Sequence, residues 1–380
     1  MKVALVHDWL TGMRGGEKCL EVLCELYPDA DLFTLVHVPG TVSKTIENRR
    51  IITSFIQKLP MVRSHYRSYL PLFPAAVERL NVREYDLVLS TSHCVAKGVI
   101  PGEGALHLCY CHTPMRYVWD MYDAYFGPGR ISGPARLIVP GVAAKLRKWD
   151  VATVNRVHYF VANSRHVQKR IERIYQRTAE VIYPPVDTAG TWQSESIGEY
   201  FLIVSAFAPY KRIDLAVKAF NQLGEKLLII GTGQDEKKLK REAGRNISFL
   251  GWTEARELGR YYAECRALIF PGEEDFGIVP VEAQCYGKPV IAYGTGGALE
   301  TVKGIRAADE SDHKNGYTGV FFEEQTVDSL IQAVHLFQRI KFNTEMIRDH
   351  ALAFDRNVYK EKMKLFIHQK LNEWKASHAS

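Results

Sequence analysis

The chain has 380 residues, of which 46% are hydrophobic and 24% are charged, a balance typical of a soluble globular protein long enough for two domains. Its formal net charge of +6 is too small to indicate nucleic-acid binding, but it is compatible with contact to an anionic membrane surface. No apolar run reaches the roughly 18 residues of a membrane span. The seven cysteines lie mostly in expected strands and helices, so we expect buried, reduced thiols and a cytoplasmic protein.

Apolar runs alternate with amphipathic stretches along the chain. The expected strands of the first half are 3–6, 32–36, 87–90, 106–109 and 157–162, and those of the second half are 200–204, 226–230, 247–250, 267–270, 289–292 and 320–322. Such alternation is typical of parallel sheets whose strands are joined by crossover helices. The sequence therefore predicts two doubly wound α/β domains that bind ligands at the carboxyl ends of their strands.

Pro184 and Pro185 mark the boundary between these domains, because neither a helix interior nor a central strand accepts two such residues. A small, polar stretch follows at 188–196. We therefore expect domains at 1–184 and 185–356. An amphipathic helix over 357–380 ends the chain.

A glycine loop follows the first expected strand. Gly15 and Gly16 precede a predicted helix, so backbone N–H groups there can approach an oxyanion with no side chain in the way. The loop lacks the G-x-G-x-x-G pattern, which argues against a nicotinamide-dependent enzyme. A plain tight turn is the alternative explanation.

His112 falls at the end of a predicted strand, where ligands are expected, among aromatic and basic residues. Its neighbour Cys111 suggests a metal site, but no partner pair with zinc spacing occurs elsewhere. We therefore expect no metal. Arg116 is a candidate for binding a phosphate of a donor or acceptor, or for pairing with Asp120 one helical turn away.

Cations and glycines also follow the strands of the second half. Lys211 and Arg212 stand at a predicted helix start, where the helix dipole opposes positive charge and so favours an anionic partner. A solvated helix start is the alternative. Gly231 and Gly233 follow the next strand and permit close approach of the backbone to a ligand.

The most informative stretch is 270–283. An apolar strand ends in an acidic loop that contains Glu274, and a helix with Pro280 in its first turn follows. Glu282 lies in that helix, with seven residues between it and Glu274. A diphosphate suits the free N–H groups of the first turn and the helix dipole; these groups belong to Gly277, Ile278 and Val279. Glu274 can then accept from sugar hydroxyls and Glu282 from ribose hydroxyls.

Together with Phe276-Gly277, this stretch resembles the signature of the retaining sugar-nucleotide glycosyltransferases of family four. The resemblance covers the chain from Lys2 to about Phe366 and is most specific over 204–301. It implies the GT-B fold, two Rossmann-like domains facing a deep cleft, with the last helix packed back on the first domain. The segment around His112 is similar to one in bacterial mannosyltransferases that build O-antigen polysaccharides.

The resemblance also implies roles for individual residues. It places Glu274 and His112 beside the reacting sugar and Arg14 and Arg116 near the acceptor. The donor would be bound by Gly15, Gly16, Lys211, Arg212, Gly231, Gly233, Leu250, Phe276, Gly277, Ile278, Val279 and Glu282. Ala206 stands where the family usually has a diphosphate-binding arginine, and Arg212 stands where it often has glycine. We expect Arg212 or another base to replace the missing charge.

The function that follows is transfer of a hexose, most simply mannose from GDP-mannose, to a lipid-linked oligosaccharide in bacterial O-antigen synthesis. A UDP- or dTDP-sugar donor stays open. We expect no cofactor or metal, and we interpret Asp29-Ala30-Asp31 as a turn rather than a metal-binding pair. Mixed apolar, aromatic and basic segments at 55–73 and 136–149 are compatible with peripheral contact with the cytoplasmic face of an inner membrane. A core helix with a basic rim is the alternative explanation.

Two other functions fit a sugar-nucleotide fold. One is an epimerase of similar build, which would isomerise the donor sugar and need no acceptor. The other is a non-catalytic sugar-nucleotide sensor, supported only by Ala206. The sequence predicts nothing about the oligomeric state.

Overall fold

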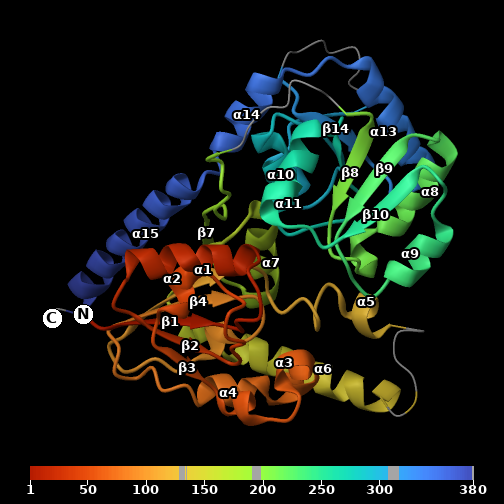
Figure 1. Ribbon diagram of the computed structural model, residues 1–380. Coiled ribbons are helices and arrows are strands. Elements are labelled where there is room, and N and C mark those ends of the chain that lie inside the picture. Colours follow the sequence, from red (N-terminus) through yellow and green to blue (C-terminus); the bar gives the residue numbers. More distant parts are fainter. Residues whose placement is uncertain (128–132, 134, 191–197, 307–315, 379–380) are drawn as a thin grey trace. The chain divides into compact units, whose positions relative to one another are not determined.

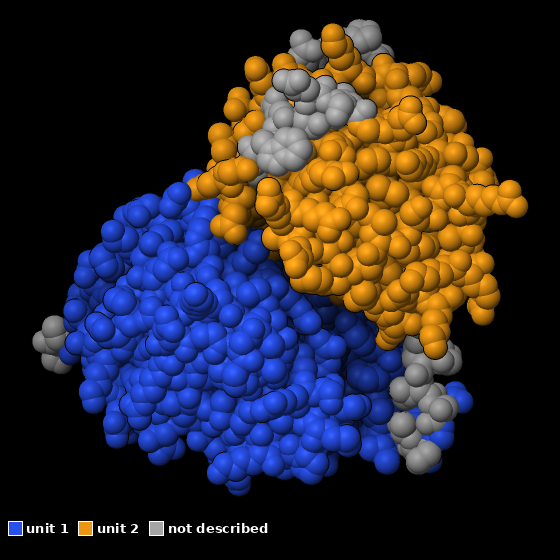
Figure 2. All heavy atoms as spheres, in the orientation of Figure 1, with its two compact units in different colours: residues 1–185, 356–380 blue, residues 186–355 orange. Residues whose placement is uncertain are grey.

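The computed structural model describes residues 1–127, 133, 135–190, 198–306 and 316–378. The described chain divides into two compact units, residues 1–185 with 356–380, and residues 186–355, which Figure 2 shows in two colours. The sequence placed the domain limits at 184/185 and assigned the last helix to the first domain. Each unit is built around one parallel sheet.

The sheet of the first unit has the strand order β3-β2-β1-β4-β5-β6-β7, and every pairing is parallel. Its strands are β1 (Val3–His7), β2 (Asp31–Thr34), β3 (Ile51–Thr53), β4 (Leu87–Ser92), β5 (Leu106–Cys111), β6 (Tyr159–Ala162) and β7 (Ala179–Val181). The order reverses between β1 and β4. Loops at the carboxyl ends of these two strands therefore form the position where such sheets bind ligands.

Helices cover both faces of this sheet (Figure 1). They are α1 (Gly15–Leu26), α2 (Lys44–Glu47), α3 (Val62–His65), α4 (Phe73–Glu78), α5 (Tyr122–Phe126), α6 (Ala135–Ala152), α7 (Arg165–Tyr175) and α15 (Arg356–Ser377). The core of one face joins α1 and α15 to the sheet. The core of the other face includes residues of α3, α4 and α6.

The last helix, α15, belongs to the first unit, as the sequence predicted. Tyr359, Met363 and Ile367 are buried in the same core as α1. Arg356 forms ion pairs with Glu21 and Glu25 of α1, at 3.1 and 2.6 Å. Because partly exposed ion pairs contribute little stability, the apolar contacts hold this helix in place.

The second unit repeats the pattern with the strand order β10-β9-β8-β11-β12-β14-β13, again with parallel pairings. Its strands are β8 (Tyr200–Val204), β9 (Lys226–Ile230), β10 (Ile247–Gly251), β11 (Leu268–Phe270), β12 (Val290–Tyr293), β13 (Gly304–Ile305) and β14 (Gly319–Phe322). Its helices are α8 (Ile213–Leu223), α9 (Glu236–Glu242), α10 (Ala255–Glu264), α11 (Ile278–Cys285), α12 (Ala298–Thr301), α13 (Val327–Arg339) and α14 (Thr344–Leu352). The reversal here lies between β8 and β11.

Across the described residues, no helix combines the length and apolarity needed to cross a lipid bilayer.

Candidate active site

Two loops at the reversal point of the second unit bring opposite charges together. Lys211 lies in the loop between β8 and α8, and Glu274 lies in the loop between β11 and α11. Their side chains form an ion pair, and less than a fifth of each is exposed. The two loops meet at Gly272, where a Cβ atom would stand only 2.8 Å from the Cα atom of Lys211. The backbone contact thus fixes the distance between the loop that carries the Glu274 carboxylate and the loop that carries the Lys211 ammonium group.

Helix α11 begins directly after the acidic loop. Its N-cap is Gly277, with φ +90°, a conformation that side-chain-bearing residues rarely adopt. The N–H groups of the first turn are therefore presented beside Glu274, and their partial positive charge suits an anion. Phe276, which precedes them, is buried against Phe354. The sequence predicted this combination of carboxylate, turn and helix start.

A glycine pair after β12 supports the acidic loop. The N–H of Gly297 donates to the carbonyl of Glu274 at 2.8 Å. Cβ atoms at Gly296 and Gly297 would stand 2.6 Å from the Glu274 carbonyl oxygen and 2.3 Å from Phe276. These glycines allow backbones to touch, so their place in the sequence reflects packing of the loop that carries Glu274.

Glu282 lies within α11, and its Oε2 atom accepts a hydrogen bond from the Tyr262 hydroxyl at 3.0 Å. Burial and the nearby carboxylate raise the pKa of Tyr262 well above its usual range, so the phenol stays a donor. Tyr262 also stacks on Tyr286, with ring centroids 5.6 Å apart. This arrangement fixes the orientation of a carboxylate predicted to accept from ribose.

Gly231 and Gly233 have a packing role that the sequence left open. A Cβ atom at Gly231 would lie 1.9 Å from the carbonyl oxygen of Ser205, and one at Gly233 would lie 2.6 Å from backbone atoms of Phe207. Both contacts bind the loop after β9 to the loop after β8. Leu250 lies in β10 and is about a third exposed. The predicted contacts of these residues with a donor stay predictions.

Arg212 is the N-cap of α8 and has φ +52°. Its Nη1 atom donates to Gln325 at 3.0 Å, and its Nε atom lies 3.3 Å from Asp214. The family pattern has glycine here, which accounts for the left-handed backbone. The sequence predicted that Arg212 or another base replaces the phosphate-binding charge missing at Ala206. That stays a prediction, and in the structure the Arg212 side chain contacts Gln325 and Asp214.

The first unit gathers histidines around the start of α1. Gly16 lies beside two of them: a Cβ atom there would be in van der Waals contact, at 3.5 Å, with both His112 Nε2 and His7 Cε1. His7 ends β1 and bonds Thr91 at 2.6 Å through Nδ1, while its Nε2 atom lies 3.7 Å from Glu17. The Glu17 carboxylate in turn accepts from the backbone N–H of Arg14 at 3.0 Å and caps α1. The predicted residues Gly15, Gly16 and His112 thus share one site with residues that were not predicted.

The charge state of this cluster follows from burial. Burial lowers the pKa of His112 well below its usual value, and the neighbouring His93, His7 and Arg116 lower it further. His112 is therefore a neutral hydrogen-bonding group at physiological pH. Burial raises the pKa of Glu17, but the His7 imidazole 3.7 Å away, the nearby His93 and a backbone N–H outweigh that effect and leave the pKa lowered.

Asp8 shapes the loop on the other side of the cluster. It is fully buried and accepts four backbone hydrogen bonds of 2.6–2.9 Å, from residues 93–96. It also lies 3.2 Å from His93 Nδ1. The structural parts played by His7, Asp8, Glu17 and His93 were not predicted from the sequence. The signal was present in His7-Asp8, a polar pair directly after a buried strand.

The two arginines predicted near the acceptor lie at the same edge of the sheet. Arg14 is exposed at the N-cap of α1, and Arg116 is half-buried in the segment after β5. Asp120, which the sequence offered as a partner for Arg116, pairs with Arg170 at 2.9 Å and with Arg173. Acceptor binding by Arg14 and Arg116 stays a prediction.

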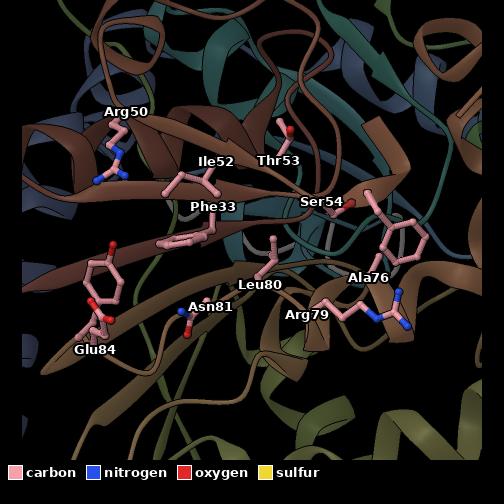
Figure 3. A pocket seen from close by; sticks show the side chains of 12 residues that line it. Phe33, Arg50, Ile52, Thr53, Ser54, Ala76, Arg79, Leu80, Asn81 and Glu84 are labelled. Carbon is pink, nitrogen blue, oxygen red and sulfur yellow. The ribbon is translucent and has the colours of Figure 1, made fainter. Parts of the chain in front are cut away.

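A separate cavity of about 510 Å³ lies beside the edge strand β3 (Figure 3). Phe33 and Leu80 lie in its middle, with Arg50 toward one end and Arg79 toward the other. None of its lining residues belongs to the predicted site; they are Phe33, Arg50, Ile52, Thr53, Ser54, Phe55, Ala76, Arg79, Leu80, Asn81, Glu84 and Tyr85.

Within the ranges described, no three His, Cys, Asp or Glu side chains are grouped as a metal site requires.

Comparison with known proteins identifies the family. Residues 13–189 match the model described as Glycosyltransferase Family 4, and residues 192–348 match the one described as Glycosyl transferases group 1. Between them the two models cover nearly the whole chain. The chain belongs to the family-four glycosyltransferases.

Curated relatives of the transferase share part of its length. An uncharacterised glycosyltransferase of Methanocaldococcus jannaschii is 27% identical over 65% of this chain and 69% of that protein. The GDP-mannose-dependent monoacylated alpha-(1-6)-phosphatidylinositol monomannoside mannosyltransferase of Corynebacterium glutamicum is 35% identical over 26% of this chain and 30% of its own. The O-antigen chain mannosyltransferase C of Escherichia coli is 30% identical over 27% of this chain and 30% of its own. The last two alignments thus span less than a third of either protein.

Solved structures share the fold of the transferase over its whole length. Sucrose-phosphate synthase from Thermosynechococcus elongatus matches with a TM-score of 0.71 at 16% identity, covering 98% of this chain and all of that one. Anabaena Alr3699/HepE, solved in complex with UDP and glucose, matches with a TM-score of 0.67 at 18% identity, covering 97% and 99%. The predicted GT-B architecture of two Rossmann-like domains is confirmed.

Proposed function

We propose that the transferase moves mannose from GDP-mannose, with retention of configuration, to a lipid-linked oligosaccharide in bacterial polysaccharide synthesis. The observation that carries a sugar-nucleotide donor is the pairing of Lys211 with Glu274 beside the start of α11. The mannose donor is supported by the two mannosyltransferases among the relatives, one named as GDP-mannose-dependent and the other as acting on the O-antigen chain.

The chemistry follows from where charge develops. As the bond between the anomeric carbon and the phosphate oxygen breaks, negative charge grows on the diphosphate and positive charge on the sugar ring. Lys211 and the first N–H groups of α11 stabilise the departing diphosphate. Glu274 accepts from sugar hydroxyls and fixes the ring without attacking it. The acceptor oxygen bonds to the anomeric carbon on the face that the phosphate leaves, and its proton passes to the departing phosphate oxygen.

Neutral His112 suits a different task in this scheme. With its pKa held well below the usual value, the imidazole exchanges hydrogen bonds with sugar hydroxyls and adds no charge. A cation there would repel the positive charge that develops on the sugar. The first unit would therefore present an uncharged imidazole to the sugar.

A donor screen tests the proposal. The purified full chain is incubated with GDP-mannose, UDP-glucose or dTDP-glucose and a membrane lipid extract, and release of nucleoside diphosphate and labelling of lipid are measured. We expect both signals with GDP-mannose, together with thermal stabilisation by the donor. Isomerised sugar in the absence of lipid would indicate an epimerase, and donor binding without any product would indicate a sensor.

The acceptor's lipid requires contact with a membrane, and one surface of the first unit fits this need. We call it the basic apolar surface: the exposed side chains of Met61, Arg63, Arg67, Leu72, Leu137, Ile138, Lys145 and Lys148. The segments that carry these residues, which include α3 and α6, pack on the same core (Figure 1). Large apolar side chains surrounded by cations suit the headgroup layer of an anionic bilayer.

Co-sedimentation with vesicles of phosphatidylglycerol and phosphatidylethanolamine tests this surface. Each lysine near an anionic membrane contributes about 1 kcal/mol, so we expect the double variant Lys145→Glu and Lys148→Glu to bind at least tenfold more weakly. The matched control is Lys362→Glu with Lys364→Glu, two exposed lysines of α15. Equal loss in both double variants would show that only net charge matters.

A further inference from the structure

Three loops at the carboxyl edge of the second sheet are tied together by one side-chain relay. Arg212, in the loop after β8, donates through Nη1 to Gln325 Oε1 at 3.0 Å. Gln325, in the loop after β14, donates through Nε2 to the carbonyl oxygen of Pro271 at 3.0 Å. Pro271 opens the acidic loop that carries Glu274. The guanidinium group is thus connected to the base of the donor-binding loop.

We propose that Arg212 is a positioning residue that holds the Pro271–Glu274 segment in place through Gln325, rather than a ligand of the donor phosphate. The proposal rests on the proposed transferase function and assigns Arg212 a different role within it. Neither Arg212 nor Gln325 need touch the donor for this role. The relay acts on the backbone of the loop, while Lys211 acts on its carboxylate.

The geometry of the guanidinium group favours this role. Its Nε atom lies 3.3 Å from the Asp214 carboxylate, and its Nη1 atom is engaged by Gln325. A carboxylate beside the guanidinium offsets the positive charge that a diphosphate would seek. The planar fork of arginine suits such a two-partner arrangement, since it presents several donors in fixed directions.

The backbone at this position gives an independent argument. Arg212 has φ +52° and ψ +36°, the left-handed region, which is unfavourable for a residue with a side chain. Glycine would fit here without strain. A residue held in this conformation by its surroundings indicates that the side chain has a function there, and the relay to Pro271 supplies one.

Together with a second hydrogen bond, the relay holds the backbone of the acidic loop at both of its ends. Gly297 N–H donates to the Glu274 carbonyl at 2.8 Å on one side. Gln325 holds the Pro271 carbonyl on the other. One of the two residues between these anchors is Gly272, which lies against the Lys211 backbone. Loss of either anchor would free the loop to move the Glu274 carboxylate away from its position.

The test compares Arg212→Gly, Gln325→Ala and the double variant in the full-length transferase. We expect each single change to lower kcat for sugar transfer about tenfold while the Kd for GDP, measured by calorimetry, stays within twofold. Because both residues act in one relay, the double variant should be no more than twofold slower than the slower single variant. Arg212→Lys should restore little, since lysine lacks the fork.

A readout that needs no turnover distinguishes this proposal from the proposed function. Hydrogen exchange of amides 272–277 should quicken in Arg212→Gly and in Gln325→Ala, but not in the control Arg245→Gly, an exposed arginine of the same unit. Arg212→Gly should unfold at an equal or higher temperature, because glycine relieves the left-handed backbone. A wild-type chain without transfer activity would remove the proposed function and leave this exchange result standing.

Two outcomes would overturn the positioning role. If Arg212→Gly weakens GDP binding tenfold or more while Gln325→Ala does not, Arg212 is a phosphate ligand. If exchange over 272–277 and kcat are both unchanged, the relay has no part in holding the loop.

Discussion

Each unit places its candidate binding groups at the carboxyl edge of a parallel sheet, where the strand order reverses. The two units differ in the charge that these groups offer to a ligand. In the second unit the main groups are the backbone N–H donors at the start of α11 and the ion pair between Lys211 and Glu274, whose partners a bound ligand can replace. In the first unit two buried carboxylates already have partners: Asp8 accepts from four backbone N–H groups, and Glu17 lies beside His7 and accepts from the Arg14 N–H. The groups of the second unit suit a charged ligand, whereas the first unit offers the neutral His112.

This difference matters because the reaction separates charge. An anionic leaving group requires cations and helix donors, whereas a sugar that becomes positive is destabilised by any added cation. Desolvation disfavours the charged form of a histidine, so the first unit keeps His112 neutral. Substitutions in the second unit should therefore reduce catalysis, and substitutions in the first unit should reduce stability or acid tolerance.

The largest effect should come from the second unit's ion pair. We expect Lys211→Ala and Glu274→Gln each to lower kcat/KM for the donor about 10²–10³-fold, because each removes a charged group placed for the transition state. Initial rates of nucleoside diphosphate release measure this. Lys240→Ala, which breaks the 2.7 Å pair with Glu236 on exposed α9, is the matched control. Similar losses in the control and in Lys211→Ala would show that any surface ion pair matters equally.

The first unit's counterpart is Asp8, where we expect a loss of stability. Asp8→Asn removes a charge that four backbone N–H groups share and replaces an acceptor by a donor. Hydrogen bonds to a charged group contribute about 1.5–3 kcal/mol each, so a fall of about 3 kcal/mol in the free energy of unfolding is expected. Urea titration followed by circular dichroism measures it. A change below 1 kcal/mol would show that the loop at 93–96 does not depend on this carboxylate.

Acid should act on the first unit before the second. The histidines with lowered pKa values include the fully buried His107 and the partly buried His93 and His112 of the first unit, with desolvation as the main cause. His107, bonded to Ser90 and to the Arg156 carbonyl, has a pKa of about 3. Below pH 6.5 the unfolded state binds protons at these histidines that the folded state does not bind. Their contribution to the free energy of unfolding is therefore fully present above pH 6.5. It falls by up to about 1.4 kcal/mol per pH unit per histidine as the pH drops toward 3.

Hydrogen exchange at pH 7 and pH 5 checks this order of unfolding. Amides of β4 and β5 should lose more protection than amides of β8 and β9. His107→Asn should flatten the dependence, since it removes one of these lowered pKa values and keeps a polar side chain between Ser90 and Arg156. A second unit that opens first on acidification would contradict the assignment of acid sensitivity to these histidines.

Much of the fold could be predicted from the sequence, since long apolar runs alternate with amphipathic ones. The strands that escaped are β3, β7 and β13, each of two or three residues at or beside a sheet edge. Their pairing depends on the neighbouring strand. A segment of two or three residues is too short to show the alternation of apolar and polar residues that predicts a strand. The second-unit site was likewise visible because Glu274, Gly277 and Glu282 lie close together in sequence.

The first-unit site depends on contacts that no local pattern encodes. Glu17 meets His7 ten residues away, and Asp8 meets residues 93–96 across more than 80. The Arg212 relay likewise joins positions 113 residues apart. Gly231 and Gly233 show the reverse case, since their sequence pattern indicated ligand approach whereas their positions in the fold also require backbone packing. A glycine pattern alone cannot distinguish the two.

The smallest effect concerns the ribose side of the donor. Tyr262 holds Glu282 by a 3.0 Å hydrogen bond, so Tyr262→Phe should leave the carboxylate in place but less well oriented. We expect KM for the donor to rise about three- to tenfold with kcat nearly unchanged, because a ribose contact is made equally in ground and transition states. Tyr261→Phe is the matched control, since its hydroxyl bonds Glu257 on the exposed side of α10 at 3.3 Å. A fall in kcat at constant KM would place Glu282 with the reacting sugar, and would move part of the catalytic charge from the acidic loop into helix α11.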